Sequence, residues 1–117
     1  MNYDTPLIDV KIIREMLYND ENYVKEFANA SLQSFSEFKE GFNKSVTQRE
    51  LDDLRRAGHK IKPVATMLHL EPLLEMYETS KTLLEENAEQ KELQEITSEM
   101  DAYCSQVLAE FEEIAKE

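Results

Sequence analysis

The sequence predicts an all-α protein, an antiparallel up-down-up-down four-helix bundle with a short N-terminal capping helix. Apolar residues recur at spacings of three and four along almost the whole chain, and strict alternation is absent. The 117 residues include only two glycines and three prolines, whereas a β-sandwich or barrel of this size needs many tight turns. Short polar segments separate the helical stretches, and short connections make successive helices antiparallel. The length is typical of one domain, so residues 1–117 are expected to form a single domain.

The apolar pattern places the first two helices in the N-terminal part of the chain. A short helix is expected over residues 7–18 and a longer one over residues 21–42. Asn19 or Asp20 is a natural N-cap for the second helix, and Gly41 lies where we expect that helix to end. The apolar stripe of the second helix consists of Val24, Phe27, Ala28, Ser31, Leu32, Phe35, Phe38 and Phe42.

Three further helices follow. Thr47 and Glu50 have the spacing of a capping box, which predicts that a third helix opens there and covers residues 48–69. Pro72 is favourable in the first turn of a fourth helix that reaches about residue 86. The fifth helix is expected over residues 89–116. The buried stripe of the third helix would consist of Leu51, Leu54, Gly58, Ile61, Ala65 and Leu68.

The charge balance is strongly acidic, with 13 Lys and Arg against 25 Asp and Glu and a net charge of -12. Nucleic-acid and anionic-membrane binding both need a positive surface, so neither is expected. Residues 71–117 hold 14 acidic and 3 basic residues, a net of -11. No apolar run approaches the roughly 18 residues of a membrane span, and the first residues lack the order of a signal peptide. We therefore expect a cytoplasmic protein with no membrane partner.

Few residues are of types that support metal or nucleophile chemistry. A single cysteine, Cys104, excludes an internal disulfide and a multi-cysteine zinc site, and we expect it to be buried. Neither histidine follows a glutamate by three residues, as carboxylate di-iron sites require. The chain has no glycine-rich phosphate loop and no GxSxG or HExxH motif. No metal or cofactor is predicted.

One segment departs from the acidic composition. Residues 55–62, the cationic segment, read Arg-Arg-Ala-Gly-His-Lys-Ile-Lys, with four cations, one histidine and no acid. His59 follows Gly58 of the buried stripe by one residue, so its side chain should point away from that stripe, toward solvent or toward the groove between two helices. Gly58 and Pro63 are both costly inside a helix, by about 0.5–1 and about 3 kcal/mol respectively. The simplest interpretation of Pro63 is that the third helix kinks or ends near Lys62.

An exposed imidazole among cations is suited to carrying a phosphoryl group. A neutral imidazole is a nucleophile near neutral pH, because the ordinary pKa of histidine is about 6.5. Neighbouring cations stabilise the equatorial oxygens of a phosphoryl group during transfer. Lys62, one helical turn beyond His59, is the best placed of them.

The run His59-Lys60-Ile61-Lys62-Pro63-Val64 resembles the His-x-Leu-Lys-Gly motif of histidine phosphotransfer (HPt) domains. These domains are phosphohistidine carriers in the phosphorelays of bacterial two-component signal transduction. The expected helix order also resembles that family along the whole chain. The resemblance implies that His59 is the phosphoacceptor and that Lys62 stabilises the phosphate.

The chain departs from the family pattern at three places. Pro63 and His69 stand where the family has glycine. The glutamine that often orients the imidazole would fall near Lys81, which cannot accept a hydrogen bond from the ring. Glu78, on the same face of the fourth helix, could take its place, or the ring could lack support.

The resemblance implies a phosphorelay intermediate that carries a phosphoryl group between aspartates of receiver domains. Such a carrier is not an enzyme by itself and needs no cofactor, since Mg²⁺ and most catalytic groups belong to the receiver. The implied partners are a response-regulator receiver domain, a hybrid histidine kinase, or both, with the carrier a monomer. The candidate docking residues are Arg55, Arg56, Lys60, Pro63, Val64 and Met67. Two alternatives remain open: an acidic helical-bundle module that binds a basic partner, and an HPt-like kinase regulator without a working histidine.

Overall fold

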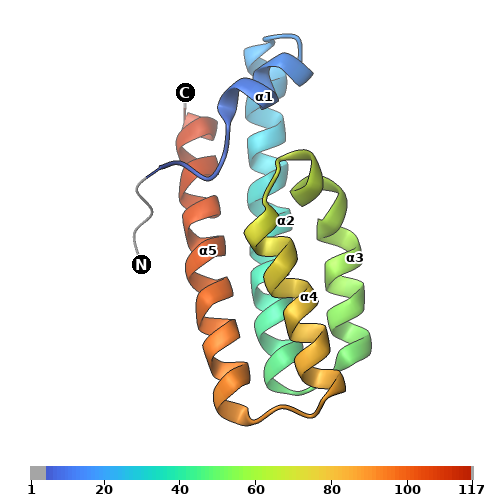
Figure 1. Ribbon diagram of the computed structural model, residues 1–117. Coiled ribbons are helices and arrows are strands. Elements are labelled where there is room, and N and C mark those ends of the chain that lie inside the picture. Colours follow the sequence, from blue (N-terminus) through green and yellow to red (C-terminus); the bar gives the residue numbers. More distant parts are fainter. Residues whose placement is uncertain (1–4, 117) are drawn as a thin grey trace.

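The computed structural model describes residues 5–116, which form five helices and no strand (Figure 1). The predicted all-α class is therefore confirmed. None of the described helices is long and apolar enough to cross a membrane. The helices are α1 (Val10–Met16), α2 (Glu21–Thr47), α3 (Leu51–Met67), α4 (Glu71–Glu85) and α5 (Gln90–Lys116).

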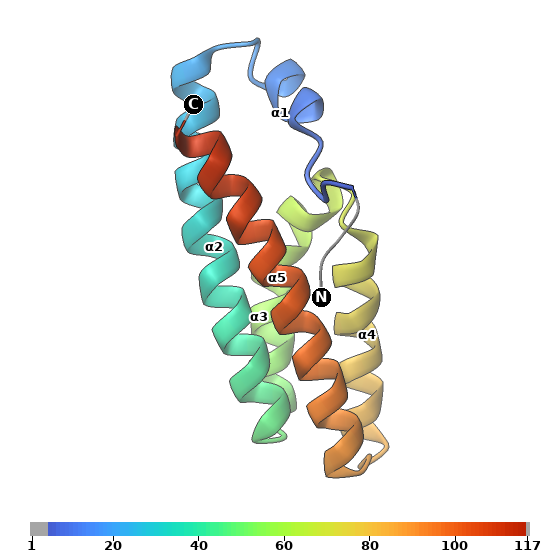
Figure 2. The same cartoon turned by 90° about the vertical axis from the view of Figure 1, so that its left-hand side faces the viewer.

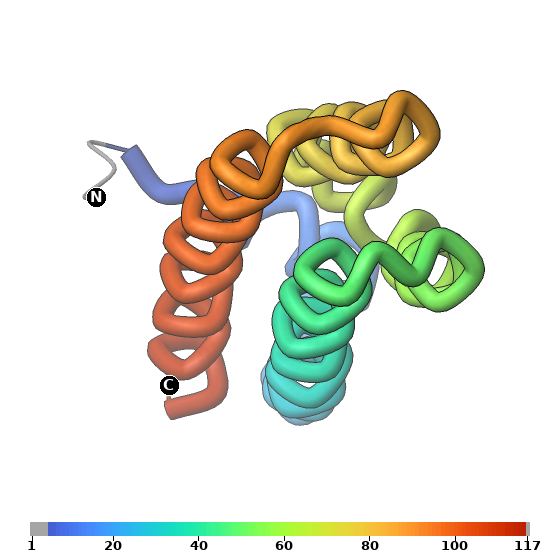
Figure 3. Tube along the Cα trace, turned by 90° about the horizontal axis from the view of Figure 1, so that it is seen from below, coloured from blue at the N-terminus to red at the C-terminus, as the bar shows by residue number. Residues whose placement is uncertain are grey.

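The four long helices lie side by side around one core (Figures 1 and 3). The most extensive contact is between α2 and α5, and α3 lies against α2 and α4. Aromatic rings join the first pair, because Phe111 of α5 stacks on Phe35 at 5.8 Å and meets Phe27 edge-on at 6.1 Å between centroids. Helices α3 and α4 are shorter than their neighbours, and α1 lies beyond their ends, near the first turns of α2 (Figure 2).

The apolar periodicity correctly predicted which side of each long helix is buried. In α3, Leu54, Gly58, Ile61, Ala65 and the following Leu68 are buried. The helix bounds were predicted less well. α1 is shorter than residues 7–18, and α2 continues past Gly41 to Thr47 instead of stopping at residue 42. A glycine in a helix whose flanking turns are well packed lowers stability without ending the helix.

The predicted capping box at Thr47 is wrong. Thr47 is the last residue of α2, and its hydroxyl pairs with the Asn43 side chain of the preceding turn. Arg49 adopts a left-handed conformation with φ 58°, and the Glu50 N–H donates to the Ser45 carbonyl at 2.8 Å. This is a Schellman ending, which satisfies the terminal carbonyls of α2. Glu50 then becomes the N-cap of α3 without a side-chain capping bond.

Helix α3 does not end at Lys62. It continues through Pro63 to Met67, and its ribbon leans inward over the last turns (Figure 1). Proline removes one backbone donor and crowds the preceding turn, which bends a helix without necessarily ending it. The helix ends when His69 adopts φ 57° and the Leu70 N–H donates to the Ala65 carbonyl at 2.9 Å. His69 thus occupies the left-handed position that favours glycine.

A carboxylate of α5 fixes the segment before α1. Glu110 accepts the backbone N–H of Leu7 at 3.0 Å and that of Ile8 at 2.8 Å, one with each oxygen. The Gln106 side chain donates to the same carboxylate at 2.8 Å. The side chain of Ile8 is buried in the core. This pairing of one carboxylate with two backbone donors attaches the N-terminal segment to the far end of the chain.

We expect His69→Gly to raise the free energy of unfolding by about 0.5–1 kcal/mol, because glycine adopts positive φ without steric cost. Urea denaturation followed by circular dichroism measures the change. His59→Gly is the matched control: the same substitution inside α3 should lower stability by a few tenths of a kcal/mol. Equal effects of the two substitutions would contradict the assignment of His69 to the helix ending.

Glu110→Ala should destabilise the fold by about 1–3 kcal/mol, because two backbone donors lose a charged acceptor. The Leu7 and Ile8 amides should exchange with solvent faster than in the unmodified protein. The control is Glu113→Ala, which removes an exposed carboxylate that pairs with Lys116 at 3.7 Å. It should change stability by less than about 0.5 kcal/mol. Unchanged exchange at Leu7 and Ile8 in Glu110→Ala would refute the anchor.

Candidate functional site

His59 lies on the exposed side of α3, the first of the two directions that its offset from the buried stripe left open. Its neighbours one turn away, Arg55, Arg56, Lys62 and Pro63, are also exposed. Gly58, the residue before it, is buried. The helix therefore presents the imidazole outward while the adjacent backbone is packed inward.

Contact with α4 explains the glycine at position 58. A Cβ placed on Gly58 would lie 1.9 Å from Cζ of Tyr77, which is far inside contact distance. The Tyr77 ring thus occupies the space that a side chain at position 58 would need. This close approach of α4 to α3 explains why a residue that disfavours helix stands at position 58, next to His59 in the sequence.

Glu78 and Lys81, the two residues proposed to support the imidazole, have other partners near Tyr77. The Tyr77 hydroxyl donates to the Arg55 carbonyl at 3.5 Å, and the Lys81 ammonium lies 4.7 Å from the centre of the tyrosine ring. Glu78 pairs with Lys81 at 3.0 Å. Neither Glu78 nor Lys81 forms a hydrogen bond with His59 within residues 5–116. The structure therefore brings Glu78 and Lys81 to each other and not to the ring.

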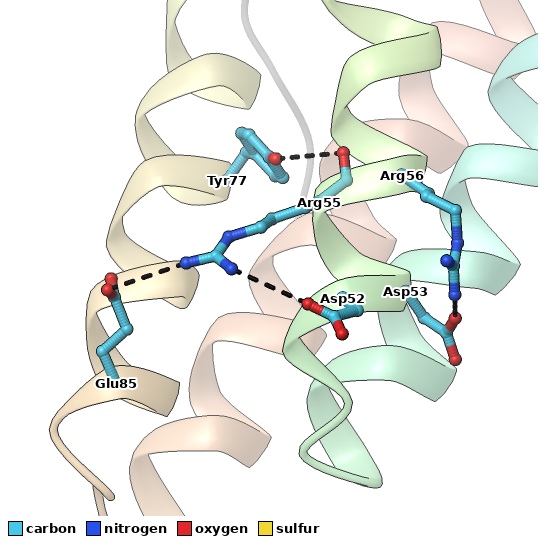
Figure 4. Close-up of polar contacts among 6 residues, drawn as sticks. All are labelled: Asp52, Asp53, Arg55, Arg56, Tyr77 and Glu85. Carbon is cyan, nitrogen blue, oxygen red and sulfur yellow. Dashed lines mark hydrogen bonds and ion pairs between the residues drawn. The ribbon is translucent and has the colours of Figure 1, made fainter.

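Carboxylates compensate the two arginines of the cationic segment (Figure 4). The Arg55 guanidinium lies 3.7 Å from Asp52 of α3 and 3.9 Å from Glu85 of α4, and Arg56 pairs with Asp53. Hydrogen bonds from Glu50 and from Arg56 lower the pKa of Asp53 below its ordinary value. Exposed pairs of this kind contribute at most about 1 kcal/mol, so an incoming anion can compete for the arginines.

The two lysines beside His59 are available as cations. Lys60 and Lys62 are exposed, and neither forms an ion pair within the described part of the chain. Lys62 is one turn from His59 on the same side of the helix. Lys60, one residue from His59, lies on the α2 side of the helix, so the positive charge that an anion at His59 would meet without displacing a carboxylate comes from Lys62.

The apolar docking candidates lie further along α3. Pro63 is exposed, whereas Val64 and Met67 are half-buried, and Val64 packs against the core. Positions 60, 64 and 67 follow one another at helical spacing beside the His59 side of the helix. Because Val64 and Met67 are half-buried, they offer only a small apolar area to a partner.

Cys104 and the acidic residues form no second site in the described chain. Cys104 is buried, and burial, followed by repulsion from Asp101, raises the pKa of its thiol to about 12. A thiol in that environment stays protonated and unreactive at neutral pH. Residues 5–116 contain no group of three or more His, Cys, Asp or Glu side chains that could hold a metal ion.

Tyr77 and Glu85 contact Arg55 beside the site, and neither was predicted there from the sequence. Both lie on α4, so their positions depend on the register between two helices. The mid-helix glycine was the one signal that a bulky side chain packs against position 58. The sequence does carry the signal for two ion pairs, because residues three apart are neighbours on a helix. These are the pairs of Arg55 with Asp52 and of Arg56 with Asp53.

Comparisons of the chain with models of protein families, with curated proteins and with solved structures find no match.

Gly58→Ala should lower the free energy of unfolding by about 1–3 kcal/mol, because the new methyl group overlaps the Tyr77 ring. Thermal and urea denaturation measure the loss. Gly41→Ala is the control: a Cβ there would lie 3.8 Å from the Ala57 Cβ, so alanine should raise stability by about 0.5–1 kcal/mol. Adding Tyr77→Leu to Gly58→Ala should recover part of the loss. Strictly additive destabilisation would contradict the proposed contact.

Proposed function

We propose that the chain is a phosphorelay intermediate that carries a phosphoryl group on His59 between aspartates of receiver domains. The observation that carries the proposal is the exposed imidazole with Lys62 one turn away and no carboxylate paired to either group in the described chain. The resemblance of residues 59–64 to the HPt motif supports the same reading. The implied partners are a receiver domain and a hybrid histidine kinase in the cytoplasm.

The proposal includes a topology. The four long helices α2 to α5 would form an antiparallel up-down-up-down bundle, with α1 as a cap and His59 on the second of them. Connections of a few residues between successive long helices support this arrangement, because short loops join antiparallel neighbours. In this arrangement the residues around His59 form one continuous outward surface on a single helix.

The proposed transfer is a substitution at phosphorus. The lone pair of Nε2 of His59 forms a bond to phosphorus while the bond from phosphorus to the aspartyl oxygen breaks. The aspartate leaves as a carboxylate with the bonding electrons, and the imidazole keeps its proton on Nδ1. Lys62 would stabilise the phosphoryl oxygens, whose negative charge is largest near the transition state. The partner's own active site supplies the remaining groups, so the chain acts as a carrier and not as an autonomous enzyme.

A kinase regulator that uses the same surface without phosphate transfer is the second candidate. It is favoured by the engagement of Glu78 with Lys81, which leaves the imidazole without an acceptor from either residue. An acidic module that binds a basic partner is a third reading, supported by the net of -11 over residues 71–117. Both readings predict that no phosphate reaches His59.

Incubation with the receiver domains of the source organism, each loaded with labelled phosphate, tests the proposal. We expect at least one receiver to pass label to the chain as an acid-labile, alkali-stable phosphate. His59→Gln should abolish the label, and His69→Gln, which changes the other exposed histidine, should retain it. No label from any receiver, or label that persists in His59→Gln, would refute the carrier and leave the two binding readings.

Lys62→Ala should slow transfer by about tenfold or more, because it removes a charge from the transferring phosphoryl group. The folded state should persist, since Lys62 is exposed. Lys91→Ala, an exposed lysine of α5, is the matched control and should leave the rate unchanged. Equal rates for Lys62→Ala and Lys91→Ala would remove Lys62 from the mechanism.

A further inference from the structure

A groove between α2 and α3 offers a second place for a ligand. Its volume is about 400 Å³, within the range of small-molecule sites. It lies on the α2 side of α3, and neither His59 nor Lys62 lines it. The groove is thus separate from the proposed phosphoacceptor, although Lys60 on its rim adjoins His59 in the sequence.

Gly41 keeps this groove open. A Cβ added to Gly41 would lie 3.8 Å from the Cβ of Ala57, an ordinary contact, so helix packing does not require glycine there. Gly58 differs, because the Tyr77 ring excludes any side chain at that position. A glycine inside a long helix destabilises it relative to alanine. What the glycine provides at position 41 is space in the wall of the groove.

The floor of the groove is apolar and its rim carries available cations. Phe38 and Ile61 lie in it and are 3% and 2% exposed. Lys44 and Lys60 line it and form no ion pair within residues 5–116, while the charge of Lys44 is one of the causes that lower the pKa of the nearby Asp53.

The lining also holds two acidic residues. Asp53 pairs with Arg56, whereas Glu37 accepts a hydrogen bond only from the neutral side chain of Gln33, at 3.2 Å, and keeps its charge. With Lys44, Arg56 and Lys60 against Glu37 and Asp53, the lining carries a net charge of +1 in a chain whose net charge is -12.

We propose that the groove binds a small amphiphilic anion, a flat apolar body with one carboxylate-like charge. The body would lie on Phe38 and Ile61 in the space left by Gly41, and the charge would meet Lys44 and Lys60. The hydroxyl of Ser45, which lines the groove and forms no hydrogen bond within the described chain, is a further donor. This binding does not depend on phosphate transfer at His59.

Titration of the full chain with 1-naphthoate, followed by amide chemical shifts in NMR, tests the proposal. We expect saturable shifts centred on Gly41 and Ala57. The uncharged 1-naphthamide, which has the same aromatic body, should bind at least fivefold more weakly. Equal binding of the two probes, no saturable binding of 1-naphthoate, or shifts centred outside α2 and α3 would overturn the proposal.

Variants locate the site. Gly41→Leu should weaken binding at least tenfold by filling the groove, and Gly41→Ala, which the packing tolerates, should weaken it to a smaller extent. Lys44→Gln combined with Lys60→Gln should remove the preference for the charged probe. Lys39→Gln is the matched control, because Lys39 lies on α2 but lines a different cavity next to α5, which shares only Lys44 with the groove. Loss of binding in Lys39→Gln, or unchanged binding in both Gly41 variants, would refute the assignment.

The outcome is independent of the carrier function. His59→Gln should bind 1-naphthoate as the unmodified chain does, because His59 does not line the groove. A chain that binds the probe but accepts no phosphate would refute the carrier alone. A chain that accepts phosphate but does not bind the probe would refute the groove alone.

Discussion

The contact between the Tyr77 ring and the backbone at Gly58 determines how α3 and α4 fit together around the site. The ring lies where a side chain of residue 58 would be, so α4 approaches the α3 backbone more closely than any other residue at that position would permit. This approach places Glu85 within reach of Arg55 and sets Lys81 over the tyrosine ring. The side of α3 that contains position 58 packs against α4. His59 is the next residue in the helix, so its side chain points outward.

The acidic excess of the chain does not determine what an anion meets at α3. At physiological ionic strength, exposed charges more than about 8 Å apart are largely screened, so nearby groups dominate. Near His59, three carboxylates compensate Arg55 and Arg56, while Lys60 and Lys62 keep their charge available. A formal count of four cations in the segment therefore reduces to two that an anion can use without displacing a partner.

Periodicity predicted the elements of this fold better than their ends. Burial of residues such as Leu54 and Phe111 follows from the three-four spacing, because one side of each helix must face the core. The boundary between α2 and α3 was misread, because the Thr47–Glu50 spacing fits a capping box while the observed ending needs Arg49 at positive φ. The exposure of His59 was predictable within one helix. Tyr77 and the groove beside Gly41 were not, because they depend on how neighbouring helices pack.

Gly58 and Pro63 both disfavour a helix, and they affect two different backbone carbonyls near His59. In a regular helix the Arg55 carbonyl accepts the His59 N–H, and here the Tyr77 hydroxyl reaches that same carbonyl at 3.5 Å. The His59 carbonyl has no donor four residues later, because that residue is Pro63. The turn that carries the imidazole therefore has an added contact with α4, whereas the turns after Pro63 lean inward, with Ala65 and Leu68 buried. Both effects act on the backbone of α3 and leave the imidazole of His59 exposed.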